Sequence, residues 1–129
     1  MANITSAGLA AIAGLVSNVG SVTAFTYVAT GTGTTVFGVA QTTLVAEILD
    51  SGLARATVTP TRTTTTATND TIQWQKAFSV TGTKTVGEVG ILNASSTGIL
   101  LCRNVLSPTK SVTSGDTLTV TYTMPFSNA

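Results

Sequence analysis

The alternation of threonine with apolar residues near the C-terminus is the strongest constraint on how this chain folds. From residue 117 to residue 126 the sequence reads TLTVTYTMPF, so every second residue is apolar and threonine stands at most positions between. A two-residue period places the two kinds of side chain on opposite faces of a β-strand. The segment therefore predicts a half-buried strand with a threonine-covered outer face.

Similar patterns predict further strands over residues 24–30, 53–66, 71–81, 86–92 and 99–106. Pro60 makes the second of these an edge strand or a bulged one. Lys76 interrupts the apolar face of the 71–81 strand, as an inward charge that guards a sheet edge would. Residues 42–49 predict a short helix. The predicted fold is mainly β and typical of an antiparallel β-sandwich or small barrel. The pattern does not distinguish a jelly-roll topology from an immunoglobulin-like one.

The first 20 residues have a different period. Their apolar residues recur at steps of three and four, as in a helix: Leu9, Ile12, Leu15, Val16 and Val19. We expect the N-cap at Asn3, Thr5 or Ser6 and the end at Gly20. No charged side chain occurs before Glu47, and a helix without a well-solvated face is usually buried on more than one side.

We therefore predict an N-terminal helical arm over residues 1–20 and a β-sandwich domain over residues 21–129. The arm packs either on its own sheet or on a neighbouring chain. Its candidate protein-interface residues are Ile4, Leu9, Ile12, Leu15, Val16 and Val19.

The scarcity of charge indicates a surface covered by partners. Only 9% of the residues are charged, against roughly 25% in an ordinary domain, and 28 are threonine. A free monomer normally keeps a charged surface to stay dispersed. A secreted or surface β domain with a hydroxyl-rich face is the alternative. The six basic residues are scattered, so nucleic acid is not an expected partner.

The residues needed for catalysis or metal binding are scarce. The chain has no histidine, and only Glu47 and Asp50 among its five acidic residues lie close in sequence. Cys102 stands in an apolar run, where it is expected to be a small buried hydrophobe. We therefore expect a non-enzymatic protein without cofactor, metal or membrane contact. The N-terminal stretch lacks the basic residues of a signal peptide and its apolar run is short and broken, so we expect assembly in the host cytoplasm.

Several sequence segments resemble those of the small virion structural proteins of tailed bacteriophages. They are AFTYVATGTGTT (24–35), TTLVAEI (42–48), EVGILNASSTGILLCR (88–103) and SVTSGDTLTVTYTMPF (111–126). Proteins of this kind are head decoration (cement) proteins or tail and fibre components.

The resemblance and the uncharged arm favour a capsid decoration protein. Such a protein would be a homotrimer on the capsid surface of the virion that binds the major capsid protein and bridges its subunits. The alternative is a tail, baseplate or fibre-associated adhesion module that binds a host surface glycan.

Overall fold

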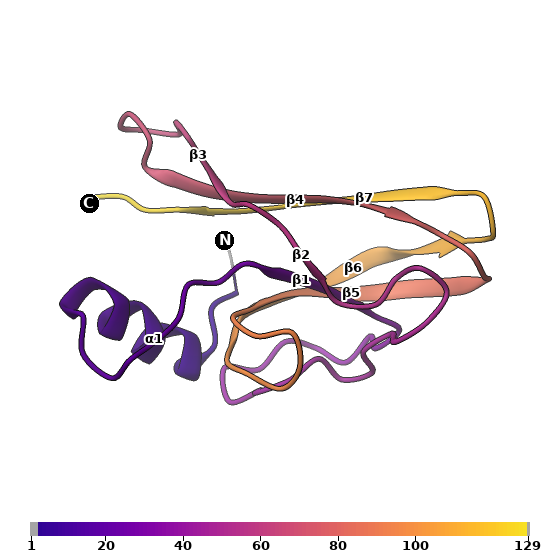
Figure 1. Ribbon diagram of the computed structural model, residues 1–129, viewed down its shortest axis with the longest axis horizontal. Helices are drawn as coiled ribbons and strands as arrows, with labels where there is room; N and C mark the ends of the chain where they lie inside the picture. Colours follow the sequence, from indigo (N-terminus) through magenta and orange to yellow (C-terminus); the bar gives the residue numbers. More distant parts are fainter. Residues whose placement is uncertain (1–2, 129) are drawn as a thin grey trace.

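Two antiparallel sheets face each other, and one helix lies beside one end of them (Figure 1). The structure is a computed structural model and describes residues 3–128. It confirms the predicted fold class, a mainly β antiparallel sandwich with an N-terminal helix. Residues 1, 2 and 129, which the predicted domain boundaries include, lie outside the described residues, and the division at residue 20 stays a prediction.

The four-stranded sheet has the order β2-β1-β5-β6. Its strands are β1 (Tyr27–Gly31), β2 (Ala56–Thr57), β5 (Lys84–Leu92) and β6 (Leu100–Val112). Both faces of β5 are buried, as its nearly continuous apolar sequence indicates. Its inner face meets the other sheet, and its outer face lies under a long loop.

The three-stranded sheet has the order β3-β4-β7. Its strands are β3 (Thr61–Thr63), β4 (Thr71–Ser79) and β7 (Thr117–Pro125). The predicted 53–66 strand is divided between the sheets, because β2 lies in one and β3 in the other, with Pro60 between them. Proline has no N–H for a ladder hydrogen bond, so the strand stops there and the chain crosses to the second sheet.

Apolar side chains from both sheets fill the space between them. Trp74, Phe78 and Tyr122 come from the three-stranded sheet, and Val28 and Ile91 come from the other. The Trp74 indole packs edge-on against the Tyr122 ring, with the ring centres 6.5 Å apart. The indole N–H donates to the Phe25 carbonyl at 2.7 Å, so this large side chain is buried with its polar atom satisfied.

Residues 32–49, the covering loop, lie across the outer face of the four-stranded sheet (Figure 1). The predicted helix at 42–49 is wrong, because this segment is extended and irregular. Leu44 and Ile48 have helical spacing, yet each is buried in a different apolar cluster. The N–H groups of Val45 and Ala46 donate to Glu88 instead of to a helical carbonyl.

Helix α1 (Ser6–Ser17) is packed against β6. Thr5 is its N-cap, and the Thr5 hydroxyl accepts the Gly8 N–H at 2.9 Å. The helix ends at Asn18, which takes the left-handed conformation with φ 56°, so the predicted end at Gly20 is wrong. The left-handed residue at a helix C-terminus is usually glycine, and asparagine is the other residue that takes this position.

Replacing Gly8 by alanine is expected to destabilise the protein by about 1–3 kcal/mol, although alanine is the better helix former. A Cβ at this position would overlap the backbone carbonyl of Leu101 in β6, so the helix must move away from the sheet. Urea unfolding of the variant measures the loss. Ala10→Leu, on an exposed position of the helix, is the control and is expected to change stability little. A stabilised Gly8→Ala variant would contradict the close contact.

Candidate assembly surface

Helix α1 presents an exposed apolar face. On the helix, Leu9 is 57% exposed, Leu15 40% and Val16 84%, and Val19, just beyond the helix end, is 67% exposed. Ile4 and Ile12, also predicted as contacts, are half-buried and pack against the main core. The helix therefore packs on its own sheet and still leaves apolar side chains uncovered. Whether these residues form an interface stays a prediction.

An apolar groove of about 300 Å³ runs beside this face. The helix contributes Ile12, Leu15 and Val16 to one side of it. The remaining lining residues come from the end of the sandwich and are all apolar: Ala24, Phe25, Pro60, Ile72, Trp74, Leu101, Met124 and Phe126. Exposed apolar surface of this kind marks sites of contact with other proteins.

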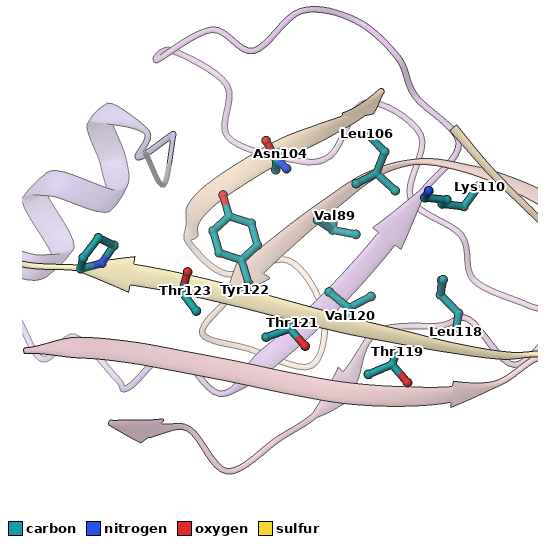
Figure 2. A pocket seen from close by; sticks show the side chains of 11 residues that line it. Val89, Asn104, Leu106, Lys110, Leu118, Thr119, Val120, Thr121, Tyr122 and Thr123 are labelled. Carbon is teal, nitrogen blue, oxygen red and sulfur yellow. The ribbon is translucent and has the colours of Figure 1, made fainter. Parts of the chain in front are cut away.

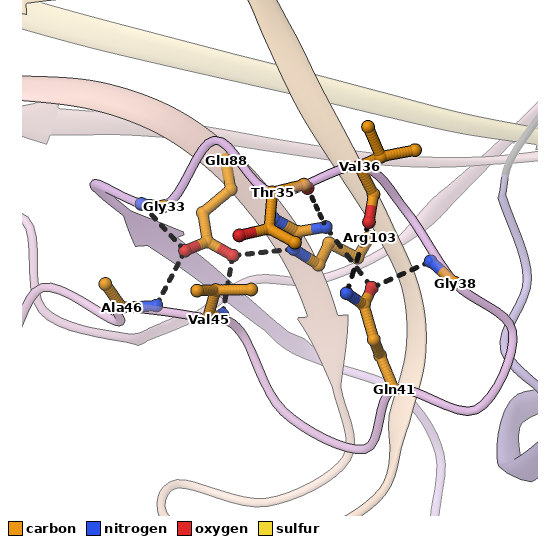
Figure 3. Close-up of polar contacts among 9 residues, drawn as sticks. All are labelled: Gly33, Thr35, Val36, Gly38, Gln41, Val45, Ala46, Glu88 and Arg103. Carbon is orange, nitrogen blue, oxygen red and sulfur yellow. Dashed lines mark hydrogen bonds and ion pairs between the residues drawn. The ribbon is translucent and has the colours of Figure 1, made fainter.

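A buried ion pair anchors the covering loop (Figure 3). Glu88 of β5 and Arg103 of β6 are both fully buried, and the Arg103 Nε donates to the Glu88 carboxylate at 2.7 Å. The same carboxylate accepts the backbone N–H groups of Gly33, Val45 and Ala46 at 2.8–2.9 Å. One side chain thus holds two distant parts of the loop on the sheet.

The guanidinium of Arg103 binds the same loop. Its Nη1 donates to the Thr35 carbonyl at 2.9 Å and to the Gln41 side-chain oxygen at 3.2 Å. Burial opposes the ionisation of Glu88, but the hydrogen bonds from Arg103 and from the Ala46 and Val45 N–H groups outweigh it. The pKa of Glu88 therefore lies below its ordinary value.

A second ion pair holds the far end of the covering loop. The Arg55 guanidinium binds both Glu47 carboxylate oxygens, at 3.0 and 2.7 Å. Its Nη1 also donates to the carbonyls of Ala94 and Thr97, so the loop is tied to the turn between β5 and β6. The loop carries its own exposed apolar residues: Val36, Val39, Val45 and Leu49.

The Ser6 N–H donates to the Val39 carbonyl at 2.8 Å. The covering loop and the start of α1 are therefore neighbours. The covering loop, the helix and Val19, which follows the helix, carry all but one of the large exposed apolar side chains of the described chain, the other being Phe126. This combined surface is the best candidate for a protein contact.

The described residues offer little for chemistry. Between residues 3 and 128, no three His, Cys, Asp or Glu side chains are close enough to hold a metal ion. Cys102 is fully buried in the inter-sheet core, and this burial raises the pKa of its thiol to about 12. Asp70 and Asp116 accept backbone N–H groups within their turns. None of the helices described between those residues is long and apolar enough to cross a membrane.

The Glu88–Arg103 pair was not predicted from the sequence. Glu88 begins and Arg103 ends a nearly continuous apolar run, EVGIL and LLCR. A charged residue in such a run is seldom buried unless it has a partner, and this was the available signal. The pattern of each run, however, does not show which other run it pairs with.

A comparison with protein families matches residues 9–124 to the podophage GP4 fiber I protein gp80 family. No curated protein matches the chain. The family description confirms the resemblance to tailed-phage virion proteins. It names a fibre protein, so it favours the tail-fibre alternative over the predicted capsid decoration, and a virion location in the tail fibre over the capsid surface. Because the match spans most of the chain, this protein belongs to the podophage GP4 fiber I protein gp80 family of phage fibre structural proteins.

Proposed function

We propose that this protein is a fibre component that docks onto another tail or fibre protein through the exposed face of α1 and the adjoining Val19. The observation that carries the proposal is the row of uncovered apolar side chains on the helix, next to an apolar groove. Burying apolar surface contributes about 25 cal/mol per Å². A contact of this kind needs no charged residue, which fits a chain that has so few.

Replacing Val16 and Val19 by aspartate is expected to lower incorporation into virions more than about tenfold, since each 1.4 kcal/mol of lost contact energy is a factor of ten. Both side chains are exposed, so the fold should be retained. The amount of protein in purified particles is the measurement. Ser95→Asp, in an exposed turn, is the matched control and should be incorporated normally. Normal incorporation of the double variant would refute docking through this face.

The number of copies of this protein in the same particles distinguishes a tail-fibre location from a capsid-surface location. A tail-fibre component should be present in far fewer copies than the major capsid protein. A decoration protein should instead approach the number of capsid subunits.

Glycan binding by the same fibre component is a second candidate. The outer face of the three-stranded sheet carries hydroxyl and amide side chains without a charge, and Gln75 donates to the Thr121 hydroxyl across it at 3.2 Å. Groups of this kind can hydrogen-bond to sugars. A glycan-binding screen with the intact protein tests this candidate independently of the helix face.

A further inference from the structure

No described strand other than β4 pairs with β7, and the register shows which backbone groups of β7 face its outer edge. The Phe126 N–H donates to the Asp70 carbonyl at 3.0 Å, and the Val80 N–H donates to the Asp116 carbonyl at 2.9 Å. These bonds bracket the regular β4–β7 ladder. In an antiparallel ladder, hydrogen-bonded pairs alternate with non-bonded pairs. The even-numbered residues of β7 therefore bond to β4.

The odd-numbered residues of β7 direct their N–H and C=O groups away from β4, toward the free edge. They are Thr117, Thr119, Thr121, Thr123 and Pro125, and only proline lacks the N–H. Among the strands described between residues 3 and 128, β4 alone pairs with β7. Four threonines thus offer a regular row of backbone donors and acceptors.

The other sheet edges have features that discourage pairing, whereas β7 does not. Strands β2 and β3 are short, with two and three residues. Beyond the stretch paired with β3, the open side of β4 carries Lys76. The edge of β6 contains Pro108 and Lys110, and its start is paired with Ile4. Natural edges are protected by shortness, charge, proline or coverage, and β7 is long, uncharged and free of proline until Pro125.

The edge of β7 is also accessible. A cleft of about 460 Å³ lies between β6 and β7 on this side of the sandwich (Figure 2). Leu118, Val120 and Tyr122 line it from the inner face of β7, and Leu106 lines it from β6. The threonines of the edge are all exposed. An added strand would therefore meet free backbone groups, with the half-buried Leu106 and Leu118 beside them.

We propose that β7 pairs with β7 of a second copy of this chain, antiparallel and about a two-fold axis at Val120. In this register Thr117 faces Thr123 of the second copy and Thr119 faces Thr121. Because these are the outward-pointing residues, every free threonine N–H of both copies meets a carbonyl. Pro125 and Gly115 fall outside the paired segment, so neither the missing N–H nor the turn interrupts it.

A second copy suits this edge because the strand is self-complementary. The two-fold axis places threonine against threonine on the outer face, and Leu118 against Tyr122 on the inner face. No charge lies on the strand to repel its own copy. The contact is closed and isologous, so it builds a dimer. The homotrimer expected from sequence would require a different contact.

The mass of the protein in solution tests the proposal first. Sedimentation across a range of concentrations is expected to give twice the 13.0 kDa chain mass. Thr121→Pro removes an outward N–H without removing a bond to β4, and proline is tolerated at such edge positions. It should weaken dimerisation more than about tenfold. Thr121→Val keeps the N–H and should remain dimeric. A monomer at all concentrations, a trimer, or a Thr121→Pro dimer of unchanged affinity would overturn the proposal.

Cross-linking tests the register and does not depend on the folding of the proline variant. Paired residues of a hydrogen-bonded pair have Cα atoms about 5.5 Å apart, which a disulfide can bridge. An equilibrated mixture of Thr119→Cys and Thr121→Cys chains is expected to form the mixed disulfide under mild oxidation, and each variant alone should form little. Cys102 is buried and should not compete. Equal cross-linking of Thr121→Cys alone would contradict the Val120-centred register.

Discussion

Replacing Glu88 by glutamine is expected to lower the free energy of unfolding by about 3–5 kcal/mol. The change leaves the fully buried Arg103 guanidinium without a counter-charge. It also weakens the acceptor for the N–H groups of Gly33, Val45 and Ala46, so the covering loop loses its main anchor. Urea unfolding followed by circular dichroism measures the loss.

Two further variants separate the buried charge from a general effect of losing a carboxylate. Glu47→Gln removes the partner of Arg55, a partly exposed pair, and should cost less. Combining Glu88→Gln with Arg103→Met removes both buried charges, including the Arg103 Nη2 that has no hydrogen-bond partner among the described residues. This double variant should recover part of the lost stability. A loss for Glu88→Gln no larger than that for Glu47→Gln would contradict the assigned role.

The lowered pKa of Glu88 also determines how its contribution depends on pH. The ordinary pKa of the group is 4.5, and the folded value lies below it. Its stabilisation is therefore fully present above pH 4.5 and is lost as the pH falls toward the folded pKa, because the unfolded chain takes up the proton first. The acid-induced fall in stability should be shallower in Glu88→Gln than in the natural chain.

Replacing Trp74 by alanine is expected to destabilise the protein by about 3–5 kcal/mol. The indole is 2% exposed and fills the space between the sheets against Tyr122. It also lines the groove beside α1, so its loss should weaken the packing of the helix against the sandwich. Thermal and urea unfolding measure the change.

The Trp74→Phe variant divides this effect into two parts. Phenylalanine keeps an aromatic ring in the core but cannot donate to the Phe25 carbonyl. An unsatisfied buried carbonyl costs about 1–3 kcal/mol, so this variant should lie between the natural chain and Trp74→Ala. If the two variants were equally unstable, packing would not be the main contribution of Trp74.

The two-residue periods predicted most strands correctly, because a half-buried strand shows the alternation of apolar and polar residues within its own sequence. The segment 117–126 is the clearest example, and β7 occupies nearly all of it. The helix at 42–49 was predicted from the same kind of local signal and was wrong. The spacing of Leu44 and Ile48 is helical, but the Val45 N–H donates to Glu88 of β5 and the Ile48 N–H donates to the Thr30 carbonyl of β1. Local spacing cannot record a partner that is distant in the chain.

The sequence by itself determined the class of this protein: a chain of short alternating strands and one apolar helix, with too little charge to cover its surface. Only the tertiary structure decided that Glu88 and Arg103 meet, that residues 32–49 cover a sheet, and that α1 packs against β6 with one apolar face uncovered. The physical reason is the range of the interactions. Periodicity follows from contacts within a helix turn or a strand, whereas these arrangements depend on hydrogen bonds and packing between residues that only folding brings together.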